Sequence, residues 1–209
     1  MVARRPIRIG IDLDNTLVCY ERLFLALAQE RGLVPPDVTL SRIEVRNRLR
    51  AEDREHLWTE LQGEAYGPRM QDAVPFDGAL EFLARCKDAG ATVFIVSQRT
   101  RHPYRGARHD LHDAALQWLE GRGFVGRDGT GLPRANVLFK RTPGDKLTAI
   151  AALDCNHFVD DLPELLGDDR FPASTVPILF DPTGAWPASR VTRAASWNEV
   201  AALIFGKEA

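Results

Sequence analysis

The sequence predicts an α/β fold, in which a Rossmann-like parallel sheet is flanked by helices and carries a small inserted α-helical cap. Five short apolar segments alternate with segments of helical pattern, which is typical of a parallel sheet with right-handed crossovers. One stretch after the first strand is too long for a simple crossover, so an inserted unit is expected there. The chain has 209 residues, which suits one domain with a modest insertion.

Each predicted strand is short, apolar and rich in β-branched residues, as in the run ATVFIVS. Strands that are buried on both faces of a parallel sheet have this composition. The predicted strands cover residues 7–12, 91–97, 137–139, 157–160 and 176–180.

The segments between these strands have the end signals of helices. Asp77 is predicted to cap a helix that is closed by Gly90. Thr142 and Pro143 form the N-cap and first-turn proline of another. The predicted core helices cover residues 77–89, 111–120, 142–153, 162–166 and 197–205.

The stretch after the first strand has a different character. Residues 20–31 have a helical pattern that ends at Gly32. Residues 40–65 are charged with sparse apolar positions, which indicates one or two exposed helices rather than a core element. The predicted division is a core of residues 1–18 and 75–209 with a helical cap of residues 19–74.

The composition narrows the class of protein. The formal net charge is −2, so no global charge favours binding to nucleic acid or to a membrane surface. Cys19, Cys86 and Cys155 are scattered and form no CxxC pair, which argues against a disulfide framework or a zinc knuckle. No signal-peptide pattern and no apolar run of about 20 residues is present. A cytoplasmic protein with a small-molecule partner is expected, whose oligomeric state the sequence leaves open.

Reactive side chains follow the predicted strands at their carboxyl ends, where ligands of open α/β sheets collect. Four are carboxylates, which would repel one another unless a cation lay between them. Oxygen ligands without histidine or cysteine favour Mg²⁺ over zinc. The side chains are Asp12, Asp14, Ser97, Lys146, Asp160 and Asp161.

This set fits phosphoryl transfer, which needs a nucleophile, neutralisation of the phosphoryl oxygens and a proton for the leaving oxygen. Asp12 can be the nucleophile and Asp14 the proton donor. Mg²⁺, Lys146 and Ser97 can hold the phosphoryl oxygens.

The motifs resemble those of the haloacid dehalogenase superfamily. The run DLDNT from Asp12 to Thr16 looks like its motif I, Ser97 like motif II, Lys146 like motif III, and the Asp160-Asp161 pair like motif IV. The motifs occur in the family's order through most of the chain, and the cap lies where the family's C1 caps are inserted.

The resemblance implies roles for the matching positions. Asp12 would attack phosphorus, and Asp14 would protonate the leaving group and then activate water. The implied Mg²⁺ ligands are Asp12, Asp14 (through its backbone carbonyl), Asp160 and Asp161. The expected sheet order, with the predicted strands numbered along the chain, is 5-4-1-2-3. The predicted substrate-binding residues are Thr16, Ser97, Gln98, Arg99, Arg101 and Arg105.

The carboxylate at position 14 narrows the reaction. Members of the family that cleave carbon–halogen bonds lack it, so a phosphomonoester hydrolase acting on a small phosphorylated metabolite, such as a sugar phosphate or a nucleotide, is the leading hypothesis. A phosphomutase would use the same residues. A non-catalytic binding module would not need Asp14. A polynucleotide end-processing phosphatase is disfavoured by the near-neutral charge.

Several residues have competing interpretations. Lys140 rivals Lys146, but it ends a strand instead of opening a helix, and Thr100 is an alternative to Ser97. The cap arginines alternate with acidic residues, a pattern more typical of a solvated helix face than of a binding patch. The three histidines His102, His109 and His112 lie in a basic loop for which zinc binding is conceivable but has no fixed ligand spacing in its support.

Overall fold

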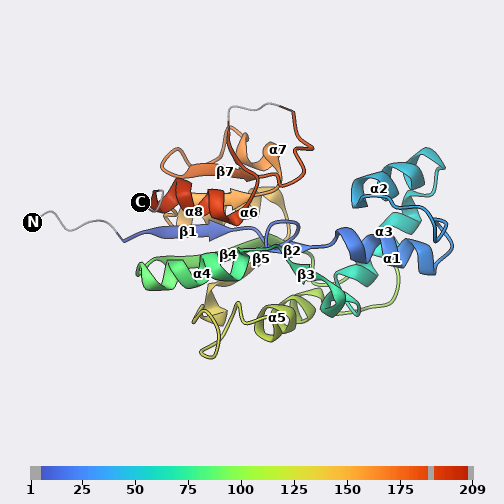
Figure 1. Cartoon of the computed structure of the whole chain (residues 1–209), viewed down its shortest axis with the longest axis horizontal. Coiled ribbons are helices and arrows are strands. Elements are labelled where there is room, and N and C mark those ends of the chain that lie inside the picture. Colours follow the sequence, from blue (N-terminus) through green and yellow to red (C-terminus); the bar gives the residue numbers. More distant parts are fainter. Residues whose placement is uncertain (1–5, 188–190, 207–209) are drawn as a thin grey trace, which may run out of the picture.

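The protein is built around one sheet of six parallel strands (Figure 1). It is described by a computed structural model that covers residues 6–187 and 191–206. The strand order is β5-β4-β1-β6-β7-β8, and each neighbouring pair is parallel. The strands are β1 (Arg8–Ile11), β4 (Thr92–Gln98), β5 (Val137–Lys140), β6 (His157–Asp160), β7 (Val176–Phe180) and β8 (Thr192–Ala194).

Helices connect the strands and cover both faces of the sheet. The core helices are α4 (Ala79–Asp88), α5 (Leu111–Gly121), α6 (Pro143–Ala152), α7 (Pro163–Leu166) and α8 (Trp197–Phe205), with a 3₁₀ turn η2 (Arg134–Asn136) before β5. The elements between β1 and α4 are β2 (Val18–Cys19), α1 (Glu21–Glu30), α2 (Arg42–Ala51), α3 (Glu55–Ala65), the 3₁₀ turn η1 (Met70–Asp72) and β3 (Val74–Pro75).

The observed order of the five predicted strands agrees with the expected one, and the predicted fold class is confirmed. The sequence did not predict β8, which extends the sheet beyond β7. Thr192 and Arg193 of this strand are exposed, and Ala194 alone is buried. A three-residue strand with one buried side chain lacks the apolar run by which the other strands were found.

Alternate residues of the strands face two separate apolar layers. Val93 and Ile95 of β4 point to the face covered by α4, α5 and α8. Phe94 and Val96 point to the opposite face, which is covered by α6 and α7. Gly10 of β1 is required on that second face, because a Cβ there would lie 2.4 Å from the ring of Phe158. The two filled faces make the strand ends the open edge of the sheet.

The helix α4 begins differently from the prediction. Asp77 does not cap it; the N-cap is Gly78, with φ of +80° and no side-chain hydrogen bond. The left-handed conformation favours glycine, and a Cβ at this position would also lie 3.2 Å from the Cβ of Trp197.

The helices α1, α2 and α3 lie together beyond the carboxyl end of β1, at the right of Figure 1. Residues 40–65 form two helices as expected, and most of their residues are exposed or half-buried. The expectation that they contribute nothing to a core was wrong. Val45, Leu49, Trp58 and Leu61 are buried in a core cluster that also includes the inner side of α1. The ring of Trp58 stacks on Phe24 with a centroid distance of 4.5 Å. Helices of about 10 residues are marginal alone, and this shared apolar interior stabilises them.

Two short strands lie at the ends of this helical segment. Val18 and Cys19 of β2 pair antiparallel with Val74 and Pro75 of β3. The two chain crossings are thereby held side by side, close to the boundaries predicted from the sequence at residues 19 and 74. The division into core and cap stays a prediction. No helix in the described ranges is both long and apolar enough to cross a membrane.

Candidate active site

Asp12 and Lys146 form a buried ion pair at the end of β1. The ammonium of Lys146 donates to Asp12 Oδ1 at 2.5 Å and to Asp160 Oδ2 at 2.7 Å. The backbone N–H of Leu162 donates to the other oxygen of Asp160 at 2.9 Å. All three charged side chains are almost completely buried. Lys146 reaches them from the first turn of α6, whose N-cap is Thr142 as the sequence predicted.

A third carboxylate completes the group. Asp12, Asp160 and Asp161 each offer an oxygen, and these oxygens lie within 4.8 Å of one another. Burial, together with the charges of Asp160 and Asp14, raises the pKa of Asp12 from 3.8 to about 7, although Lys146 counteracts the rise. Burial and the two neighbouring carboxylates also raise the pKa of Asp161 well above its usual value. One lysine does not balance three carboxylates.

The donor set and its charge fit a magnesium ion. Hard carboxylate oxygens are the ligands that Mg²⁺ prefers, and it uses few of them because it keeps several waters. A divalent cation would relieve the repulsion that raises the pKa values of Asp12 and Asp161. Within residues 6–187 and 191–206, no other group of acidic, histidine or cysteine side chains is arranged to hold a metal.

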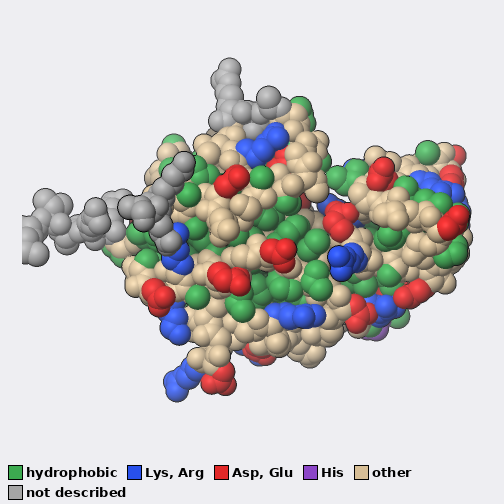
Figure 2. Space-filling view, in the orientation of Figure 1, with side chains coloured by type: hydrophobic (Ala, Val, Ile, Leu, Met, Phe, Trp, Pro, Cys, Tyr) green, Lys and Arg blue, Asp and Glu red, His purple; other side chains and the backbone are tan. Residues whose placement is uncertain are grey.

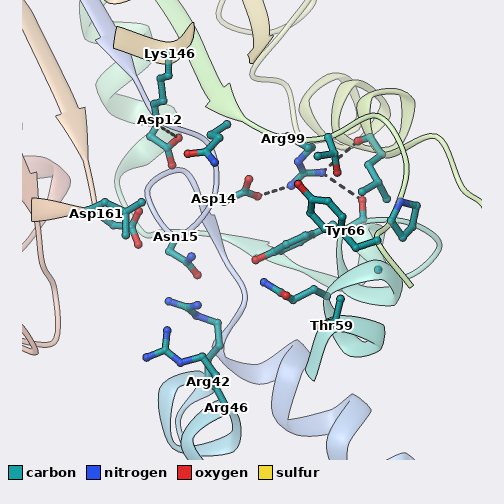
Figure 3. Close-up of a pocket in the computed structure, with 18 of the residues that line it drawn as sticks. Asp12, Asp14, Asn15, Arg42, Arg46, Thr59, Tyr66, Arg99, Lys146 and Asp161 are labelled. Carbon is teal, nitrogen blue, oxygen red and sulfur yellow. Dashed lines mark hydrogen bonds and ion pairs between the residues drawn. The ribbon is translucent and has the colours of Figure 1, made fainter. Parts of the chain in front are cut away.

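Asp14 lies two residues after Asp12, but its carboxylate has a different set of partners. It forms an ion pair with Arg99, and the hydroxyl of Tyr20 donates to the same oxygen at 2.8 Å. Ser97 Oγ donates to the second oxygen at 3.2 Å. Figure 3 shows the Asp14 carboxylate turned towards Arg99. Asp14 is not a member of the three-carboxylate group, and a metal contact through its backbone carbonyl stays a prediction.

Arg99 is itself fixed on several sides. One terminal nitrogen donates at 3.2 Å to the carbonyl oxygens of Tyr66 and Leu111, and the guanidinium lies 5.0 Å from the centroid of the Tyr66 ring. Burial alone would lower the pKa of Arg99, but the charges of Asp14 and Tyr20 outweigh it and raise the pKa above its ordinary value. Arg99 therefore connects the end of β4 to the helical segment as a permanent cation.

A cavity of about 370 Å³ opens over these side chains. Its core side includes Asp12, Lys146 and Asp161, and its other side is formed by α2 and α3. Figure 2 shows a hollow between the helical lobe and the body of the molecule, with acidic and basic side chains gathered around it. The volume is in the range of small-ligand sites.

The structure brings only some of the predicted substrate ligands to this cavity. Gln98 and Arg99 line it. Ser97 and Thr16 are completely buried and do not line it. Ser97 is instead engaged with Asp14, and Thr16 Oγ1 has no hydrogen-bond partner among the described residues. The predicted contact of these two hydroxyls with substrate stays a prediction.

Arg101 and Arg105 are not brought to the cavity. Both are exposed, and neither lines it. Arg101 pairs at 2.9 Å with Asp110, the residue that caps α5 by accepting the N–H groups of His112 and Asp113. The cap of α5 therefore draws Arg101 away from the site.

The histidines of the same loop have structural partners. A ring nitrogen of His102 lies 2.9 Å from the carbonyl of His109. His112 lies 3.0 Å from the carbonyl of Arg99 and stacks on Phe139 with a centroid distance of 4.4 Å. In the described part of the chain these histidines form no metal-binding group.

Many residues that face or support the cavity were missed or discounted from the sequence, among them three arginines and Tyr20. Arg42 and Arg46 of α2 line the cavity, as does Arg141 after β5. Tyr20 supports Asp14 from below the cavity. Ser41 followed by Glu44 is a capping-box pattern that could have placed Arg42 at the first position of a helix. A positive charge at the first position of a helix is unfavourable, because that end of the helix dipole is positive. Such a placement could have indicated that the arginine serves a role other than helix stability.

Comparisons with known proteins agree with this architecture. No family model matches the chain. The magnesium-bound HAD hydrolase YfnB of Bacillus subtilis superposes with a TM-score of 0.59 at 12% identity, covering 97% of this chain and 100% of that one. A dehalogenase with a bound intermediate superposes with a TM-score of 0.60 at 17% identity, covering 97% and 98%. This chain has the haloacid dehalogenase fold.

A curated protein also resembles the chain in sequence. The candidate nucleotidase OB0422 of Oceanobacillus iheyensis is 22% identical over 166 residues, which span 76% of this chain and 79% of that protein. The resemblance predicted from the sequence is thus confirmed for the fold. The assignment of the individual motifs to the side chains of the site stays a prediction.

Proposed function

We propose that this protein is a Mg²⁺-dependent phosphomonoester hydrolase that acts on a small phosphorylated metabolite through an aspartyl-phosphate intermediate. One observation carries the proposal. The buried carboxylate of Asp12 has one oxygen held by Lys146, while its Oδ2 accepts no hydrogen bond from any described residue and the side chain lines the cavity. A fixed carboxylate with one free oxygen suits a nucleophile.

The proposed reaction has two steps. Asp12 attacks phosphorus, an aspartyl-phosphate bond forms, and the bond from phosphorus to the ester oxygen breaks while Asp14 gives that oxygen a proton. Water then attacks the phosphorus and Asp14 takes its proton, while the bond from phosphorus to the Asp12 oxygen breaks, so that inorganic phosphate leaves and the Asp12 carboxylate is restored. Asp14 has one oxygen paired with Arg99 and the other with Ser97. Before the first step it must therefore take up a proton from solvent and turn one of these oxygens to the leaving oxygen.

The chain supplies the surroundings of this chemistry. Lys146 holds Asp12 in one orientation and contributes positive charge beside the phosphoryl group. Asp12, Asp160 and Asp161 would hold Mg²⁺. When bound, the ion would keep these carboxylates ionised and neutralise charge on the phosphoryl oxygens.

A dehalogenase is the second candidate, since a dehalogenase is among the structural neighbours. Asp14 favours the phosphatase, because a halide leaving group needs no proton and the acid would have no purpose. The magnesium bound by YfnB and the nucleotidase activity for which the Oceanobacillus protein is named support the same choice. A nucleoside monophosphate is therefore one substrate to test beside sugar phosphates.

Turnover and its metal dependence test the proposal directly. With p-nitrophenyl phosphate and a panel of phosphorylated metabolites, EDTA should abolish phosphate release and Mg²⁺ should restore it. A parallel assay for halide release from haloacids should be negative. Full phosphatase activity in metal-free buffer, or halide release without phosphate release, would overturn the proposed function.

A further inference from the structure

The helix α2 presents an unusual row of arginines. Arg42, Arg46 and Arg50 follow one another at intervals of four residues, so they share one side of the helix. Like charges at this spacing destabilise a helix. Arg42 also sits at the positive end of the helix dipole. The like-charged row and the arginine at the helix N-terminus both cost stability, so we expect the positive charge to serve in binding.

Acidic partners balance only part of this row. Arg50 is exposed and pairs with Glu55 at 2.5 Å. Arg42 is half-buried, and its nearest carboxylate contact is from Nε to Glu21 at 3.8 Å. In the described part of the chain Arg46 has no ion pair, and its one side-chain hydrogen bond runs from Nε to Asn47 at 3.4 Å. The unbalanced charge is therefore at Arg42 and Arg46.

Both of these arginines line the cavity that contains Asp12 and Lys146. Figure 3 shows their guanidinium groups extending from α2 towards the side of the cavity where Asn15 and Asp161 lie. Burial first, and then the charges of Arg50 and Arg42, lower the pKa of Arg46. A lowered pKa is expected for a cation that has other cations nearby and no anion to balance them.

The carboxylates of the site do not supply that anion. Arg42 lies near enough to Asp161 to counteract part of the rise in the pKa of that carboxyl. However, no ion pair within 4.0 Å joins the two among the described residues. Asp12 and Asp160 are engaged by Lys146, and Asp161 belongs with them to the group that could hold a metal ion. The arginines thus form a separate positive region on the opposite side of the same cavity.

We infer that Arg42 and Arg46 form a subsite for a second anionic group, so that the preferred substrate is a phosphomonoester that carries another phosphate or a carboxylate on its leaving part. This inference rests on the proposed function and deepens it. Two guanidinium groups match the oxygens of a phosphate or carboxylate in paired hydrogen bonds. A nucleoside monophosphate, or a monophosphate of an uncharged sugar, has no second anionic group to pair with these two arginines.

Matched substrate pairs test the subsite. We would compare AMP with adenosine 3′,5′-bisphosphate, which adds one phosphate, and glucose 6-phosphate with 6-phosphogluconate, which adds one carboxylate. The wild-type kcat/KM should be at least about tenfold higher for the member with the added anionic group in one pair. Arg42→Ala and Arg46→Ala should each reduce this preference by about tenfold, which corresponds to about 1.4 kcal/mol.

Arg50→Ala is the matched control, because Arg50 lies on the same helix but pairs outward with Glu55 and does not line the cavity. It should leave the preference unchanged. If Arg42→Ala and Arg46→Ala reduce the kcat/KM of both members equally, the arginines act on the transferred phosphoryl group and the subsite is refuted. Absence of any preference in the wild type refutes it as well.

A binding measurement separates this inference from the proposed function. The Asp12→Asn variant keeps both arginines, and its affinity for each substrate pair can be measured by calorimetry whether or not the protein is a phosphatase. Tighter binding of the member with the added anionic group, together with loss of this difference when Arg46→Ala is introduced as well, supports the subsite. If p-nitrophenyl phosphate is hydrolysed with Mg²⁺ but neither member of a pair is bound more tightly, the subsite alone fails. If nothing is hydrolysed, the proposed function fails and the affinities still decide the subsite.

Discussion

Replacing Asp12 by asparagine is expected to reduce phosphatase turnover by on the order of 10⁴-fold or more, as removal of a covalent nucleophile does in other hydrolases. The amide nitrogen and oxygen of asparagine have nearly the shape of the carboxylate but are poor nucleophiles towards phosphorus. Steady-state release of phosphate from p-nitrophenyl phosphate, in saturating Mg²⁺, measures the loss.

Unfolding should not account for this result. The pKa of Asp12 is raised to about 7 in the folded protein from 3.8, so its charge opposes folding at pH 8. Asparagine lacks that charge, and Lys146 keeps Asp160 as a partner. In EDTA at pH 8 the melting temperature of Asp12→Asn should therefore be no lower than that of the wild type. A folded variant that retains more than a tenth of wild-type turnover would exclude Asp12 as the nucleophile.

Replacing Lys146 by methionine is expected to have the largest effect on stability. The ammonium is buried between Asp12 and Asp160, and burial by itself lowers the pKa of Lys146 while the two carboxylates raise it above its ordinary value. Methionine keeps the length of the side chain but leaves the carboxylates without a counter-charge. Breaking a buried pair in this way costs about 3–5 kcal/mol, and turnover should fall together with the free energy of unfolding.

The pH dependence identifies the cause. Without Lys146 the folded-state pKa of Asp12 rises further above its unfolded value of about 4. In that interval the folded state binds more protons than the unfolded state, so the free energy of unfolding falls as pH rises. In EDTA the deficit of Lys146→Met should be larger at pH 8 than at pH 5, as measured by urea unfolding.

Lys140→Met is the matched control for this variant. Lys140 ends β5, does not line the cavity, and forms no side-chain ion pair in the described ranges. Its replacement should change stability by no more than about 0.5 kcal/mol. Equal and pH-independent losses for the two variants would mean that Lys146 does not balance the site carboxylates.

The strands and the carboxylates of the candidate site were predictable because each depends on short-range sequence. A strand buried on both faces must be continuously apolar, and a parallel sheet brings the carboxyl ends of its strands to one edge. Asp12 and Asp160 could thus be placed together although 148 positions separate them. The strand β8 was not predicted because two of its three side chains are exposed, so it lacks an apolar run.

The cavity side formed by α2 could not be predicted in the same way. The sequence shows arginines among acidic residues, which is also the pattern of a solvated surface helix. The direction of Arg42 and Arg46 follows from the adjoining side of α2, where Val45 and Leu49 are buried with the interior of α1 and α3. That packing is a tertiary property. Tertiary contacts also decide which residues of the loop after β4 reach the cavity: Pro103 and Tyr104 line it, whereas Arg101 pairs with Asp110.

Trapping the covalent intermediate tests the central claim most directly. The protein would be mixed with Mg²⁺ and p-nitrophenyl phosphate, quenched in acid, and treated with borohydride, which reduces an aspartyl phosphate to homoserine. Trypsin releases residues 9–22, which contain both Asp12 and Asp14, so fragmentation of this peptide must locate the change. The account predicts homoserine at position 12 and an unchanged Asp14. Homoserine at another position, or steady turnover with no modified peptide, would contradict it.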